Sequence, residues 1–149
     1  MMNNVVYLGN KELLKLPKRA FLASSTIPVE MVLKSYDWAS SRGEGDCIIS
    51  GFNSKLEQDV LHFLLKGKCT IILVLARAMY KTIPAELQSL LDAGRLLIIS
   101  TCNATRQSKA TALARNRYIC ELADAVLFVG VTEHSSLYPL KQEFNSKSH

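Results

Sequence analysis

The feature that most constrains the fold is an alternation of short apolar runs with amphipathic segments. The run at 70–75, Thr-Ile-Ile-Leu-Val-Leu, shows no alternation of polar and apolar residues. A strand of that kind needs cover on both faces, which is typical of a parallel sheet between two layers of helices. We therefore expect strands at 20–23, 47–50, 69–76, 96–100 and 125–131, with helices between them at 28–41, 55–66, 84–93 and 109–123.

The ends of the expected helices and the N-terminal segment complete this scheme. Ser54 and Glu57 stand at the spacing of a capping box, in which each residue bonds the backbone N–H of the other. Residues 5–8 read as a further short strand ahead of the repeat. The predicted fold class is an α/β, Rossmann-like three-layer sandwich with a mostly parallel sheet. Its parts are an N-terminal strand and basic link at 1–19, the Rossmann-like domain at 20–140, and a tail at 141–149 that is frayed from 145 onward.

Composition excludes several classes of function. A chain of 149 residues is long enough to bury a core without disulfides or metals. The four cysteines form no C-x-x-C pair and the three histidines share no ligand spacing, so we expect neither a metal nor a cofactor. No run approaches the roughly 18 apolar residues that cross a bilayer, and the start lacks a signal-peptide pattern. The prediction is a cytoplasmic protein without a membrane partner.

The charge of the chain is concentrated in one stretch. Between Asp92 and Glu121 there is no acidic residue, and the local excess of basic residues equals the net charge of the whole chain, +5. Such clustering favours a polyanionic partner such as nucleic acid or a nucleotide. The basic residues of the stretch are Arg95, Arg106, Lys109, Arg115 and Arg117.

The expected helix at 109–123 carries an asparagine between two of these arginines. Its apolar residues recur at helical intervals and form one stripe, with Asn116 at the centre. At about 100° per residue, Arg115 and Arg117 lie on either side of Asn116. We expect Asn116 to face the core and brace a loop, and the arginines to face an anion. The alternative is that both arginines form the solvated rim of a surface helix.

The loops after the expected strands form the predicted binding edge. In an open parallel sheet, ligands bind beyond the carboxyl ends of the strands, where helix N-termini also point. These loops, including the one that begins at Arg77, are rich in hydroxyls and amides, which suit phosphate oxygens. Gly51 allows either a close backbone approach or a tight turn, and Ser24 and Ser25 also fit helix capping. The candidate binding residues are Ser24, Ser25, Gly51, Phe52, Asn53, Arg106, Lys109, Arg115, Asn116 and Arg117.

The sequence offers little for catalysis. It contains no G-x-S-x-G, no Walker loop and no H-E-x-x-H. Glu133 and His134 are the acid and base candidates on the strand-end edge, and adjacent loop residues of this kind are more often solvated than catalytic. We therefore predict no catalytic residues.

Motifs at both ends of the chain resemble the DNA-processing protein A family, also called Smf. The segments at 115–119, Arg-Asn-Arg-Tyr-Ile, and at 123–129, Ala-Asp-Ala-Val-Leu-Phe-Val, are similar to its Arg-Asn-Arg-x-Ile helix and Ser-Asp-Ala-Val-Leu-Val-Val strand. Further similarity lies at 7–14, 19–25, 49–52 and 83–94. The chain departs from the family in three loops: Ala-Ser-Ser at 23–25 replaces Gly-Ser-Arg, the loop from Gly51 lacks Gly-x-Ala-x-Gly-Ile-Asp, and His-Ser-Ser at 134–136 replaces Ser-Gly-Ser.

The resemblance implies an extended Rossmann-like fold whose crevice binds single-stranded DNA and helps to load a recombinase. It also implies a possible homodimer through this domain. The predicted function is non-catalytic binding of single-stranded DNA or a nucleotide. One alternative is an enzyme that cleaves nucleoside monophosphates, although residues 130–134 lack the glycine-rich nest of such enzymes. The other is a nucleotide-sensing module.

Overall fold

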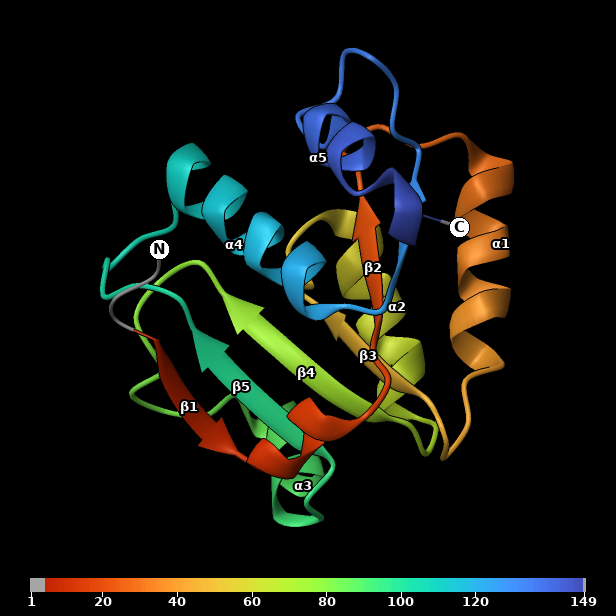
Figure 1. The fold of residues 1–149 in the computed structure, drawn as a ribbon. Coiled ribbons are helices and arrows are strands. Elements are labelled where there is room, and N and C mark those ends of the chain that lie inside the picture. Colours follow the sequence, from red (N-terminus) through yellow and green to blue (C-terminus); the bar gives the residue numbers. More distant parts are fainter. Residues whose placement is uncertain (1–4, 149) are drawn as a thin grey trace.

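A single sheet organises the computed structural model, which describes residues 5–148 (Figure 1). Its order is β1-β5-β4-β3-β2-β6, so the chain runs outward from β2 to β5 and then returns to place β6 beside β2. All neighbouring strands pair in parallel except β1, which is antiparallel to β5. The strands are β1 (Val6–Gly9), β2 (Arg19–Ala23), β3 (Cys47–Ser50), β4 (Thr70–Leu75), β5 (Leu96–Ser100) and β6 (Ala125–Val129).

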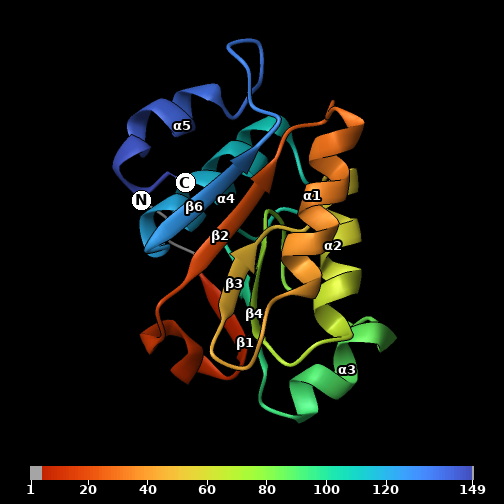
Figure 2. The same ribbon diagram turned by 90° about the vertical axis from the view of Figure 1, so that its right-hand side faces the viewer.

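Helices cover both faces of the sheet (Figure 2). One layer contains α1 (Val29–Ser40), α2 (Lys55–Leu65) and α3 (Ala85–Asp92), and the other contains α4 (Lys109–Leu122) and α5 (Tyr138–Glu143). In β4, Ile72 and Val74 pack in the cluster that includes α4, whereas Ile71 and Leu73 pack in the cluster that includes α2. Burial on both faces explains the uninterrupted apolar run, and it confirms the predicted three-layer fold.

The ends of the chain are more ordered than expected. The predicted basic link contains a short 3-10 helix, η1 (Lys11–Lys15), and the predicted tail contains α5 and a second 3-10 helix, η2 (Asn145–Lys147). Ser148 forms a parallel bridge with Val126, and the Lys147 ammonium donates to the carbonyls of Cys120 and Glu121. Residues 145–148 are thus attached to the domain rather than frayed, and His149 lies outside the described residues.

The parallel arrangement determines where the loops meet. The carboxyl ends of β2 to β6 lie at one edge of the sheet, where α2 and α4 also begin. The capping box at the start of α2 forms as predicted, between Ser54 and Glu57. Among the helices in residues 5–148, none is both long and apolar enough to cross a membrane.

Candidate functional site

A cavity of about 330 Å³ lies at the carboxyl ends of β3 and β4. Residues from α2, α3 and the loop that follows β4 complete its walls, and Gln107 and Arg115 reach it from the segment around α4. Its volume is at the lower end of the range for small-molecule sites, about 300–1,000 Å³. Four of the predicted binding residues line it: Gly51, Phe52, Asn53 and Arg115.

Arg115 is the buried cation of this cavity. It extends from α4, on one face of the sheet, and only 3% of the residue is exposed. Its Nε donates to the Asn116 side-chain oxygen at 2.8 Å, and its Nη1 lies 3.4 Å from the Val74 carbonyl oxygen. No ion pair within residues 5–148 includes Arg115. Burial lowers the pKa of the guanidinium, and the charge of Glu57 opposes this shift.

Gly51 provides the space that Arg115 occupies. A Cβ at position 51 would lie 2.5 Å from both Cζ and Nη1 of Arg115. No real Cβ tolerates such a distance, so the guanidinium rests directly against the glycine backbone. The close approach predicted for Gly51 is therefore made by a side chain of the protein itself.

We expect the Gly51→Ala substitution to lower the free energy of unfolding by about 1–2 kcal/mol, because the added methyl must displace a buried guanidinium. Urea unfolding measures this loss. In an Arg115→Ala background the same substitution should cost far less, since the obstructing group is gone. An equal cost in both backgrounds would show that Arg115 is not the neighbour that matters.

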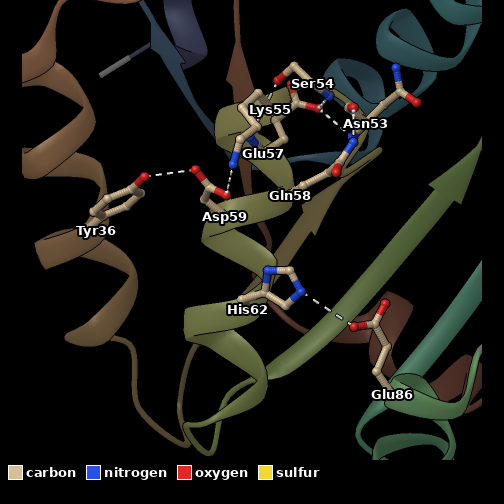
Figure 3. Close-up of polar contacts among 9 residues, drawn as sticks. All are labelled: Tyr36, Asn53, Ser54, Lys55, Glu57, Gln58, Asp59, His62 and Glu86. Carbon is tan, nitrogen blue, oxygen red and sulfur yellow. Dashed lines mark hydrogen bonds and ion pairs between the residues drawn. The ribbon is translucent and has the colours of Figure 1, made fainter.

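A buried carboxylate holds the loop after β3. Glu57 is 5% exposed and accepts hydrogen bonds from the backbone N–H groups of Ala23 at 2.9 Å, Asn53 at 2.9 Å and Ser54 at 3.3 Å. Figure 3 shows Glu57 with Asn53 and Ser54 at the start of α2. In the same loop Phe52 has a φ of 47°, a left-handed conformation that is rare for residues other than glycine. The sequence predicted the cap of α2, but no local pattern indicated the bond to Ala23.

The side of the cavity between α2 and α3 is polar and partly aromatic. Gln58 donates from its Nε2 to the Asn53 carbonyl oxygen at 2.7 Å. His62 on α2 and Glu86 on α3 point toward one another, with 3.5 Å between Nε2 and Oε2 (Figure 3). The sequence did not single out these residues, because their proximity depends on how the two helices pack.

The loop after β4 adds an aromatic ring and a guanidinium to the same cavity. The Arg77 Cζ lies 5.9 Å from the centre of the Tyr80 ring, and both residues line the cavity. Burial raises the pKa of Tyr80, against the smaller lowering effect of Arg77. Arg77 was expected at this edge, whereas Tyr80 was not singled out.

The remaining predicted residues lie outside the cavity lining. The Ser24 hydroxyl donates to the Gly130 carbonyl at 2.6 Å, at the neighbouring ends of β2 and β6, and Ser25 follows it on the surface. Arg106 and Lys109 are exposed near the start of α4, on either side of the cavity residue Gln107 in sequence.

The predicted orientation of α4 was wrong. Arg115, rather than Asn116, is the buried residue, and Asn116 is partly exposed. The predicted apolar stripe included Leu113, but Leu113 is 50% exposed. The prediction also placed Arg115 outside the buried face because arginine is charged, although the long apolar stem of an arginine can be buried. Arg117 is exposed and pairs with Glu143 of α5, through both of its terminal nitrogens.

The family of the chain follows from a sequence comparison. The family model of DNA recombination-mediator protein A matches residues 5–138. The chain belongs to this family. The cavity of this DNA recombination-mediator protein A domain lies within the matched part, since its lining residues extend from Gly51 to Arg115.

Solved structures of DNA processing protein A share this fold. The Streptococcus pneumoniae protein is 21% identical, with a TM-score of 0.75 over 96% of this chain and 52% of that one. The Helicobacter pylori protein is 21% identical, with a TM-score of 0.76 over 99% of this chain and 71% of that one. The chain therefore spans about half the length of the Streptococcus protein. A search of curated protein sequences found no significant match.

Proposed function

We propose that the chain binds single-stranded DNA at the strand-end cavity, without catalysis. The observation that carries this proposal is the buried guanidinium of Arg115, which lines the cavity and forms no ion pair within residues 5–148. The charge of Glu57 offsets only part of the cost of burying this guanidinium, and a partner of opposite charge that binds in the cavity would offset more. A phosphate of the DNA backbone is such a partner, and arginine binds it through two parallel hydrogen bonds.

The hydrogen bonds of the loop after β3 support a role for its backbone in positioning the site rather than in binding phosphate directly. The N–H of Phe52 already donates to the Ser50 hydroxyl, and those of Asn53 and Ser54 donate to Glu57. Recognition of the anion therefore depends on side-chain cations. Arg77, Arg106 and Lys109 are exposed on the same edge, and none forms an ion pair within the described part of the chain.

The relatives support DNA over a free nucleotide as the ligand. The family is that of a DNA recombination mediator, and the Helicobacter pylori structure was described in terms of a unique single-stranded DNA binding mode. The acid and base candidates, Glu133 and His134, give little support to an enzyme. Their side chains are 74% and 88% exposed, and they contact each other at 3.6 Å. Loading of a recombinase and pairing of two copies remain proposals from family membership.

Salt dependence tests the phosphate contacts. If Arg115, Arg77, Arg106 and Lys109 each neutralise one phosphate, the logarithm of the binding constant should fall with the logarithm of salt concentration at a slope of about −2.8, at about 0.7 per phosphate of a single strand. Fluorescence anisotropy with a labelled oligo-dT measures this slope. Arg106→Ala should make it shallower by about 0.7.

Lys68→Ala is the matched control, because Lys68 is exposed beyond the end of α2, at the opposite edge of the sheet. It should leave the slope unchanged. A wild-type protein that fails to bind oligo-dT at low salt would refute the proposed function. Release of free adenine from AMP would instead identify a phosphoribohydrolase.

A further inference from the structure

We propose that the cavity holds one nucleobase of the bound strand, stacked on Tyr80 and contacted at its edge by Gln58. This inference rests on the proposed function and names residues that would contact a base rather than a phosphate. It follows from the size of the cavity and from the chemistry of its walls, which carry an aromatic ring, an amide and a guanidinium.

The size of the cavity suits a single nucleotide unit. A volume of about 330 Å³ is small for a ligand site, and a stretch of several nucleotides does not fit inside it. A strand that crosses the edge of the sheet can therefore place one unit in the cavity while its other phosphates remain outside. Arg106 and Lys109 are exposed and suited to contact those outer phosphates.

The aromatic wall is suited to stacking. Tyr80 is partly exposed and lines the cavity, and within residues 5–148 no hydrogen-bond partner of its hydroxyl is found. Arg77 lies beside it, with Cζ 5.9 Å from the ring centre. Aromatic rings and guanidinium planes are the surfaces on which bases of single strands stack, and this stacking tolerates any base. Leu61, Leu73 and Leu75 line the same cavity and add apolar contact.

The Gln58 side chain lines the same cavity and provides a hydrogen bond for the edge of a base. Gln58 uses Nε2 to donate to the Asn53 carbonyl, which leaves its Oε1 available as an acceptor. Arg115 lies at the part of the cavity formed by Gly51, so the cavity offers a cation for the phosphate together with a ring for the base. This combination is what one nucleotide of a strand requires.

The test compares oligo-dT with an abasic strand of equal length, which has the same phosphates but no bases. Tyr80→Leu is expected to weaken binding of oligo-dT about tenfold and to leave binding of the abasic strand unchanged. Tyr80→Phe keeps a stacking ring and should retain the affinity for oligo-dT. Arg115→Met should weaken binding of both strands. Tyr138→Leu is the matched control, since Tyr138 is also partly exposed but lies on α5, outside the cavity.

A second measurement keeps the test independent of affinity. A 2-aminopurine in the oligonucleotide should be quenched when it stacks in the wild-type protein and in Tyr80→Phe, and should remain bright in Tyr80→Leu. Thermal unfolding of each variant confirms that it is folded. Equal losses by Tyr80→Leu on both strands, or no loss on either, would overturn the base subsite alone. A wild-type protein that binds neither strand would overturn the proposed function as well.

Discussion

Replacement of Arg115 by methionine is expected to weaken the binding of oligo-dT about tenfold to hundredfold while the protein stays at least as stable. The affinity falls because a charge-assisted hydrogen bond to phosphate contributes about 1.5–3 kcal/mol. Stability is maintained because the cost of burying the guanidinium, which lowers its pKa, exceeds the opposing attraction of Glu57. Buried charges replaced by apolar groups of similar size are often neutral or stabilising. Anisotropy titrations and urea unfolding measure the two quantities.

The loss of affinity without a loss of stability makes the experiment decisive. A guanidinium that served only the fold would lower stability when removed, and the affinity would change little in the folded variant. Arg115→Lys keeps the positive charge but loses the planar fork, so its affinity should lie between those of wild type and Arg115→Met. A methionine variant that binds DNA as tightly as wild type would contradict the proposed site.

Replacement of Glu57 by alanine is expected to lower the free energy of unfolding by about 3 kcal/mol. The carboxylate accepts from the N–H groups of Ala23, Asn53 and Ser54, and each buried donor left without a partner costs about 1–3 kcal/mol. Water can reach the groups on the loop, which limits the total. Urea unfolding measures the loss, and faster amide hydrogen exchange at Ala23 would locate it.

Two variants serve as controls for Glu57. Glu57→Gln keeps one acceptor oxygen and should cost less than the alanine variant. Glu44 is exposed in the turn before β3, so Glu44→Ala should change stability by less than about 0.5 kcal/mol. Similar losses in Glu57→Ala and Glu44→Ala would mean that the three hydrogen bonds contribute little to the fold.

The fold could be predicted from the sequence because its strongest signals are local. A strand such as β3, expected at 47–50 and found at Cys47–Ser50, is marked by its own apolar residues and by the polar loops around it. The short helix α5 was missed because its six residues bury only Leu140 and show no helical period. The same omission hid Glu143, and with it the ion pair that occupies Arg117.

The candidate site could be predicted only in part. Gly51 and Arg115 were found from a strand-end glycine and from a cluster of charge, but their mutual contact depends on how α4 packs across the sheet. The contact between Glu57 and Ala23 joins residues 34 positions apart. Tyr80 belongs to the loop between β4 and α3 and packs against the core cluster that includes residues of α2 and α3. None of these contacts is indicated by a periodic pattern in the sequence.

The position of Arg115 has a consequence for the energetics of the whole domain. Its side chain starts in the helical layer of α4 and ends in a cavity that is otherwise built largely by α2, α3 and the strand ends. Under the proposed function, the binding of a phosphate to the guanidinium is therefore coupled to the position of α4 on the sheet. Linkage then requires reciprocity: DNA stabilises the docking of α4 on the sheet by the same free energy with which a well-docked α4 strengthens the hold on DNA.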